Sequence, residues 1–196
     1  MKSVLISIKP KYCELIANGR KTIEVRKTRP KLDTPFKCYI YETLNKSKAY
    51  YIIFRESTVG QIIGEFVCDN IETICPENFI VREDAERSLS GSCLTISEAK
   101  DYAGWKGKPI CECKDLYGWH ISDLKIYDTP KELSEFVTKG ECDCMDCAKC
   151  AWLDKGDSMA EIEDDCNLVY AMMSRGVELK PIFRPPQSWR YVEELK

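Results

Sequence analysis

The chain has 196 residues, which is enough for one domain with a sizeable insertion or for two small domains. Its hydrophobic fraction of 44% is ample for a core, yet no apolar run approaches a bilayer-spanning segment of about 18 residues. The N-terminus also lacks the apolar stretch of a signal peptide, so we expect a cytoplasmic protein without a membrane partner.

The net charge of −3 is unevenly distributed along the chain. Residues 1–55 contain thirteen lysines and arginines against four acidic residues, whereas the remainder contains sixteen against twenty-eight. A basic segment of this kind favours a phosphate-bearing partner such as RNA. A solubilising surface with an uneven charge is the alternative interpretation.

The first two predicted elements are a strand and a short helix. Residues 2–8 show the alternation of a strand with one buried face. Pro10 then suits the first position of a helix, where its missing N–H costs nothing. Apolar residues follow at helical spacing, and Asn18-Gly19 predicts the end of this helix because glycine readily takes a positive φ.

The next stretch, residues 21–26, changes to the two-residue period of a half-buried strand. Its polar face carries a carboxylate and a guanidinium beside the sharp turn, and a lysine stands at each end of the preceding helix and turn. We therefore predict a functional site here rather than an ordinary solvated strand face. The predicted site residues are Lys9, Lys21, Glu24 and Arg26.

Three further stretches have the composition of strands, residues 36–43, 50–54 and 61–74. Gly60, just before the last of them, and Gly64 within it stand where a tightly curved sheet needs glycine. The aromatic residues of 36–43 are expected in the core rather than on a base-stacking surface.

The following region predicts a helix, a strand and a second helix. The first helix has an N-cap at Thr95 or Ser97 and ends at Gly104. Trp105 is expected to pack as a cover, with base stacking as its alternative role. Residues 117–127 alternate as a strand does, and Thr129-Pro130 predicts the start of another helix, whose buried stripe is Leu133, Phe136 and Val137.

Residues 138–184 form a cysteine-rich segment with the spacing C-x-C-x-x-C-x-x-C followed by one more cysteine. Closely spaced thiolates can share one tetrahedral zinc ion, and a segment of about 45 residues is too small to bury much core without such support. We expect one structural zinc, with an iron–sulfur cluster, a redox pair or unliganded thiols as alternatives. Four of five residues are the expected ligands, with Cys142 or Cys144 the first to be left out: Cys142, Cys144, Cys147, Cys150 and Cys166.

Gly19, Lys21, Glu24 and Arg26 form the pattern G-x-K-x-x-E-x-R, which resembles the signature of ASCH domains in the PUA-like superfamily. Residues 118–124 and 186–192 resemble late strands of the longer ASCH proteins of phages and bacteria. The resemblance implies an α+β fold, a small β-barrel with flanking helices. The barrel is expected to comprise residues 1–137 and 185–196, interrupted by the cysteine-rich insertion at 138–184.

The same resemblance implies a function. ASCH relatives are taken to bind RNA, and we expect RNA or a modified nucleotide to bind in a basic pocket without a cofactor for the barrel itself. The expected pocket residues are Lys9, Lys21, Glu24 and Arg26, with Gln187 and Ser188 beside them.

Two other classes of function stay open. The family includes an amidohydrolase of acetylated cytidine that uses a lysine and a threonine of the G-x-K-x-x-T-x-R form, and some members resemble ribonucleases. Here Lys21 is retained, Glu24 replaces that threonine and Thr22 is on the same strand face, so Lys21 and Glu24 are the catalytic candidates of a hydrolase. A protein-interaction module built on the acidic cysteine insertion is the third class.

Overall fold

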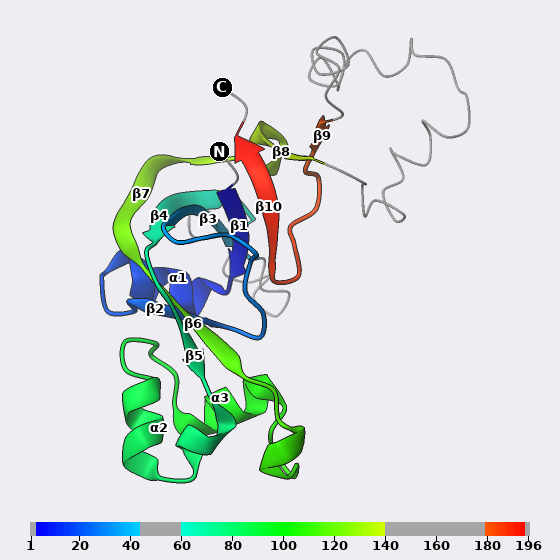
Figure 1. The fold of residues 1–196 in the computed structure, drawn as a ribbon. Coiled ribbons are helices and arrows are strands. Elements are labelled where there is room, and N and C mark those ends of the chain that lie inside the picture. The colour runs from blue at the N-terminus through cyan, green and yellow to red at the C-terminus, as the bar shows by residue number, and fades with distance from the viewer. Residues whose placement is uncertain (1–2, 44–59, 140–178, 195–196) are drawn as a thin grey trace, which may run out of the picture.

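A computed structural model describes residues 3–43, 60–139 and 179–194. The predicted strand at 50–54 and the five candidate zinc ligands lie outside these ranges. Within them, the chain folds into a mixed sheet, a smaller antiparallel sheet and three α-helices (Figure 1). The helices are α1 (Pro10–Ala17), α2 (Arg82–Ser88) and α3 (Ile96–Ala103).

The larger sheet has seven described strands in the order β7-β4-β3-β1-β10-β8-β9. β1 lies near its centre, parallel to β3 and antiparallel to β10. The first and last described strands are therefore paired with each other. Its members are β1 (Ser3–Ile8), β3 (Phe36–Glu42), β4 (Ile62–Cys68), β7 (Ser122–Lys131), β8 (Phe136–Lys139), β9 (Leu179–Pro181) and β10 (Trp189–Glu194).

The smaller sheet joins β2 (Ile23–Arg26), β6 (Leu116–His120) and β5 (Ile71–Ile74) in the order β2-β6-β5. Along the chain, β4 of the larger sheet leads into β5, and β6 leads into β7 of the larger sheet. The smaller sheet is thus joined to the larger one at both of these connections. In Figure 1 this small sheet runs from the region of α1 toward the end of the molecule that holds α2 and α3. It therefore connects the large sheet to the helical end.

The core divides into three clusters of buried side chains. One lies between α1, the large sheet and Trp119 of β6, and Trp119 is fully buried there with its ring 5.9 Å from that of Phe36. A second cluster packs α2 and α3 on the small sheet, including Phe79 and Trp105 at 4.9 Å. The third lies around Phe136, on strands β1, β3 and β4. The functional stretch at β2 is flanked by the first two clusters.

Two helices follow the sequence-based predictions closely. α1 begins at Pro10 and ends at Ala17 with Asn18 as its C-cap, and Gly19 takes a φ of 73°. α3 has Thr95 as its N-cap, with a reciprocal capping box to Glu98, and it ends at Gly104 with a φ of 75°. Both predictions are confirmed. Trp105 is 7% exposed and packs against Phe79, so it is a cover rather than a stacking surface.

The predicted helix beginning at Thr129-Pro130 is wrong. β7 continues through Lys131, a single 3-10 turn occupies Leu133–Glu135, and β8 begins at Phe136. β7 is the edge strand of its sheet, where the missing N–H of a proline is tolerated. Phe136 packs edge-on against Tyr39, with ring centroids 4.7 Å apart, and this tertiary contact outweighs the local helix signal.

The predicted strands 61–74 and 117–127 are each two strands. β4 ends at Cys68 and β5 begins at Ile71 in the other sheet, while β6 ends at His120 and β7 begins at Ser122. Asp123, next to the second break, has a positive φ of 45°. The chain thus passes from one sheet to the other at two short breaks. None of the described helices is long and apolar enough to cross a membrane.

Candidate functional site

The side chains of Lys21, Glu24 and Arg26 come together beneath the surface and form what we call the buried triad. Their relative exposures are 2%, 7% and 6%. Lys21 Nζ lies 3.2 Å from Glu24 Oε2, and Arg26 Nη2 lies 3.0 Å from Glu24 Oε1. One carboxylate therefore stands between two cations, and the group carries a formal charge of one positive unit.

Lys21 also holds β2 to the turn that follows α2. Its Nζ donates to the carbonyl oxygens of Ile23, at 2.8 Å, and Ser92, at 2.6 Å. The amides of Thr22 and Ile23 both donate to the carbonyl of Gly91 in the same turn. Two carbonyl oxygens and one carboxylate oxygen thus surround the Lys21 ammonium.

Arg26 links β2 to the first strand and to the C-terminal segment. Its Nη2 donates to the carbonyl of Ser7 at 2.6 Å, and its Nη1 reaches Ser188 Oγ at the long distance of 3.5 Å. Its Nε is buried and has no hydrogen-bond partner among the described residues. The guanidinium thus keeps donor capacity that its neighbours do not use.

Besides Arg26 Nε, three buried polar atoms lack a hydrogen-bond partner within the described parts of the chain. One of them, His120 Nε2, lies 3.1 Å from a Glu72 carboxylate oxygen. The other two adjoin the triad: Glu24 Oε2, whose ion pair with Lys21 does not have hydrogen-bond geometry, and Trp119 Nε1. Glu24 is directly opposite Trp119 in the β2–β6 register, so both side chains leave the same sheet face. An acceptor and two donors are therefore gathered on one face, and unpaired buried groups of this kind are costly.

The C-terminal segment packs over this region through side chains and backbone. Ser7 donates from its hydroxyl to the Pro186 carbonyl at 2.6 Å and from its amide to the Ser188 carbonyl at 2.9 Å. Trp189 Nε1 donates to Thr28 Oγ1 at 3.0 Å. The segment thereby fixes the basic loop that follows β2.

Two tyrosines from the helices contact the triad, Tyr12 of α1 and Tyr102 of α3. Lys21 Nζ lies 5.1 Å from the centre of the Tyr12 ring. Burial raises the pKa of Tyr102, while the positive charge of the adjacent Arg26 opposes this shift. No local pattern in the sequence indicated that these two residues meet β2.

The remaining predicted pocket residues are placed differently. Lys9 is exposed at the N-cap of α1 and forms no side-chain hydrogen bond or ion pair with any described residue, so it is not a member of the triad. Its part in ligand binding stays a prediction. Gln187 is exposed, whereas Ser188 contacts Arg26. The structure therefore brings together Lys21, Glu24, Arg26 and Ser188.

The described residues contain no group of three or more histidine, cysteine, aspartate or glutamate side chains that could hold a metal. Burial raises the pKa of the Cys13, Cys38 and Cys68 thiols, the last to about 12. Because thiolates are the metal-binding form, these three cysteines are poor ligands. The candidate zinc ligands between Cys142 and Cys166 lie outside the described residues.

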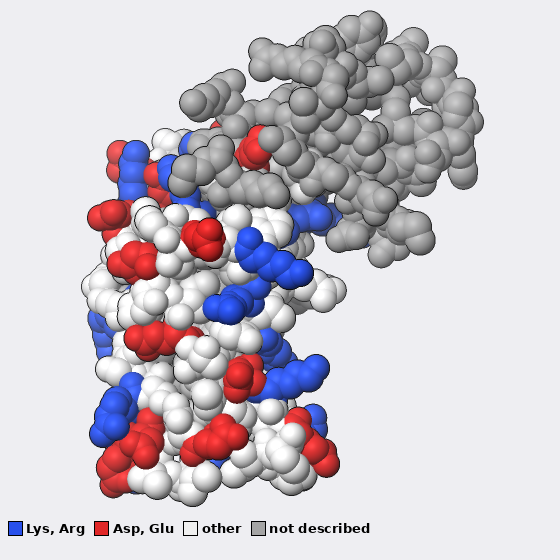
Figure 2. Space-filling view, viewed as in Figure 1, with Lys and Arg blue, Asp and Glu red and all other residues white. Residues whose placement is uncertain are grey.

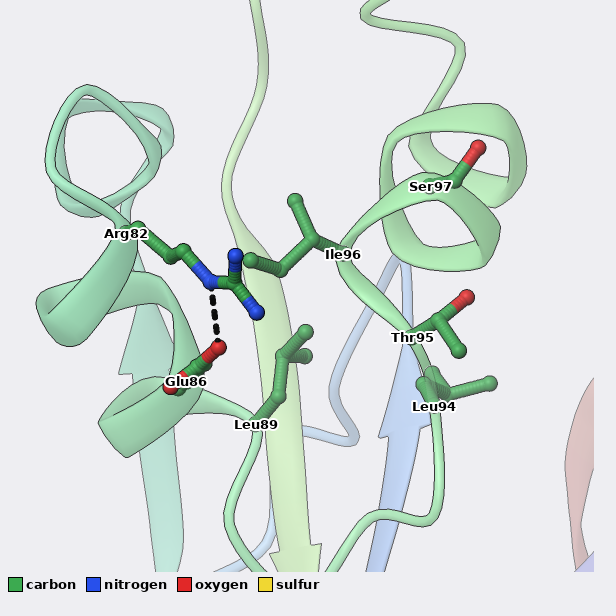
Figure 3. A pocket seen from close by; sticks show the side chains of 7 residues that line it. All are labelled: Arg82, Glu86, Leu89, Leu94, Thr95, Ile96 and Ser97. Carbon is green, nitrogen blue, oxygen red and sulfur yellow. Dashed lines mark hydrogen bonds and ion pairs between the residues drawn. The ribbon is translucent and has the colours of Figure 1, made fainter.

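A cavity of about 520 Å³ lies beside α2 and the start of α3 (Figure 3), and its lining includes no residue of the triad. In Figure 3 Arg82 and Glu86 of α2 form an ion pair on one side, and Thr95 and Ser97 stand on the other. Its apolar lining comes from Leu89, Leu94 and Ile96. The first two of these flank the turn that binds Lys21.

Gly91 provides a test of how closely that turn is fitted to β2. Its φ is 76°, and a Cβ at this position would collide with Thr22 Oγ1. Gly107 has a similar φ of 72° but open space around its Cβ position. We expect Gly107→Ala to cost about 1 kcal/mol of unfolding free energy for its backbone conformation, and Gly91→Ala about 1–3 kcal/mol more for the collision. Urea unfolding measures both losses of unfolding free energy. Equal losses would show that the turn around Gly91 moves to accommodate the methyl group without an energetic cost.

The comparisons with known proteins agree with the signature at β2. The ASCH domain family model matches residues 6–163. The chain belongs to the ASCH family. The family predicted from Gly19, Lys21, Glu24 and Arg26 is thereby confirmed, as is the α+β PUA-like fold class.

Solved structures of an ASCH protein from Zymomonas mobilis share the fold of this ASCH chain. A mutant of that protein with phenylalanine in place of one tyrosine superimposes with a TM-score of 0.53 at 16% sequence identity, covering 98% of this chain and 91% of that one. The structure of ASCH from Zymomonas mobilis without a named substitution gives a TM-score of 0.51 at 16% identity, with coverages of 97% and 87%. At this identity the likeness concerns the fold alone. None of the curated proteins compared with the sequence matches it.

Proposed function

We propose that this ASCH chain binds RNA or a modified nucleotide at the buried triad and the exposed basic side chains near it. Membership of the family supports a nucleic-acid-related role in general. The observation that carries the finer proposal is the set of unused polar atoms, Glu24 Oε2 and Arg26 Nε, in a cluster with a net positive charge. Both atoms are buried, so we infer that the side chains over them move when a nucleotide binds and supplies a donor for the carboxylate and an acceptor for the guanidinium.

The charge around the triad supports a phosphate-bearing ligand. Lys27 and Arg29 directly follow β2 in the sequence, Lys9 precedes α1, and all three are exposed and form no ion pair with a described residue. Figure 2 shows lysine and arginine side chains interspersed with acidic ones on the face that it presents, rather than one continuous basic surface. Phosphate contacts would therefore come from individual cations near β2, which act through counterion release.

The hydrolase alternative has less support from the geometry. A lysine that acts as a base or nucleophile must present a free lone pair, whereas Lys21 is held between two carbonyls and Glu24. Glu24 lies between two cations and is paired with both. These contacts favour recognition over chemistry. Turnover of RNA or acetylcytidine that is abolished by Glu24→Gln would reverse this preference.

For the cysteine-rich segment we propose one structural zinc, held by four of the five cysteines Cys142, Cys144, Cys147, Cys150 and Cys166. The support is their sequence spacing and the high thiol pKa of the buried cysteines elsewhere, which makes those unsuitable as competing ligands. An interaction module in this segment is the alternative role, and deletion of residues 140–178, which keeps β8 and β9, separates it from RNA binding at β2.

Salt dependence of RNA binding tests the proposed function. Each phosphate of a single strand that a cation neutralises contributes about 0.7 to the slope of log affinity against log salt. We therefore expect the Lys27→Ala/Arg29→Ala double variant to lower that slope by about 1.4, measured by fluorescence anisotropy with a labelled RNA. The matched control is Arg87→Ala, an exposed arginine on α2. Absence of RNA binding in the wild type, or equal slopes in all proteins, would contradict the proposal.

A further inference from the structure

Three tyrosines stand around the buried triad, and each carries a basic side chain over its ring. Lys11 Nζ lies 5.2 Å from the Tyr12 ring centre, and Lys27 Nζ lies 5.1 Å from that of Tyr102. Arg29 Cζ lies 5.7 Å from the ring centre of Tyr117. The three pairs come from different parts of the chain. The first lies within α1, the second joins the loop after β2 to α3, and the third joins the same loop to β6.

Each tyrosine also adjoins a member of the triad on its inner side. Tyr12 lies under Lys21 Nζ, and Tyr102 is beside the Arg26 guanidinium. Tyr117 is the cross-strand partner of Arg26 in the β2–β6 register, which puts both side chains on one sheet face. Each tyrosine thus adjoins a buried cation of the triad and also has a more exposed basic side chain over its ring.

The three rings reach the surface to different extents. Tyr102 is 37% exposed, and Tyr12 and Tyr117 are partly buried. Their outer cations are exposed, and Lys11 is additionally paired with Glu98 at 3.3 Å in a solvated position. A flexible lysine or arginine can move from a ring face to a nearby phosphate, while the ring then receives a base.

We propose that Tyr12, Tyr102 and Tyr117 are base-stacking surfaces, and that the ligand of this site is single-stranded RNA. The inference rests on the proposed function and specifies its substrate class. Stacking on aromatic rings beside a positively charged path is the usual way in which unpaired bases are held. Bases of a duplex are already stacked on each other, so a duplex can use the cations but not the rings.

The experiment compares a labelled single-stranded RNA with the same strand annealed to its complement, by anisotropy at low salt. We expect the single strand to bind at least tenfold more tightly. Tyr12→Leu, Tyr102→Leu and Tyr117→Leu should each weaken single-strand binding by about tenfold, as expected for loss of one stacked base. The corresponding phenylalanine variants should retain wild-type affinity because they keep the ring. Tyr102 is the most exposed of the three, so its leucine variant is the one whose fold is least affected.

Tyr127→Leu is the matched control. Its ring also has a lysine over it, with Lys131 Nζ at 5.1 Å, but it lies on β7 and packs against the third core cluster. This variant should bind RNA as the wild type does. Loss of affinity in Tyr127→Leu equal to that in Tyr102→Leu, or equal binding of single strand and duplex, would overturn the stacking proposal and leave RNA binding standing. Failure to bind either RNA would overturn both proposals.

Discussion

Replacing Glu24 with glutamine is expected to lower the free energy of unfolding by about 3–5 kcal/mol, since it leaves two buried cations without their counterion. Lys21, at 2% exposure, and Arg26, at 6%, cannot recover solvation unless the structure opens. The amide keeps the shape of the carboxylate, so the loss reports charge rather than a cavity. Urea unfolding followed by circular dichroism measures the difference.

The control for this experiment is Glu86→Gln. Glu86 pairs with Arg82 at 2.7 Å, but the two side chains are 55% and 80% exposed. A solvated pair of this kind contributes about 1 kcal/mol or less. Similar losses for the two glutamine variants would mean that water reaches the triad, and the description of a buried ion cluster would then be wrong.

Lys21→Met is expected to cost about 3–5 kcal/mol as well, for a partly different reason. The substitution leaves the carbonyls of Ile23 and Ser92 without the donor that now bonds them at 2.8 and 2.6 Å. An unsatisfied buried carbonyl is itself destabilising. The turn around Ser92 should also open locally, so the amides of Thr22 and Ile23, which donate to Gly91, should exchange faster with solvent.

Lys37→Met is the control for Lys21→Met in both measurements, hydrogen exchange and unfolding. Lys37 forms an ion pair with Glu65 at 3.0 Å, and its side chain is 39% exposed. Its replacement should cost about 1 kcal/mol or less and leave the amides of Thr22 and Ile23 unchanged. Lys21→Met with wild-type stability but without RNA binding would assign Lys21 a role confined to the ligand, contrary to the structural role argued here.

Local signals predicted the elements around the site well. Pro10 and Asn18-Gly19 delimit α1, and the capping residues Thr95 and Gly104 delimit α3, because each acts within a few residues of the chain. The G-x-K-x-x-E-x-R stretch predicted the family, and alternation correctly set Glu24 and Arg26 on one face of β2. The same kind of local signal failed at Thr129-Pro130, where packing of Phe136 decides the structure.

The interior of the site depends on contacts that no local pattern contains. The carbonyl of Ser92 accepts from Lys21 across a sequence separation of 71 residues. The carbonyl of Ser7, in the larger sheet, accepts from Arg26, in the smaller one. Sequence reasoning expected an open concavity lined by four charged residues. Instead, three of them pair with one another below the surface, since the adjacent α1, α3 and C-terminal segment exclude solvent from β2.

The most direct test of the account is a titration of the ¹⁵N-labelled protein with single-stranded RNA, followed through the N–H resonances of Arg26 Nε and Trp119 Nε1. Both groups are buried and lack a hydrogen-bond acceptor among the described residues. We predict saturable shifts of both resonances with one shared dissociation constant, as a polar ligand contacts Arg26 and alters the adjoining face of β6. RNA binding that leaves both resonances unmoved, with shifts confined to other parts of the chain, would contradict the assignment of the triad as the ligand site.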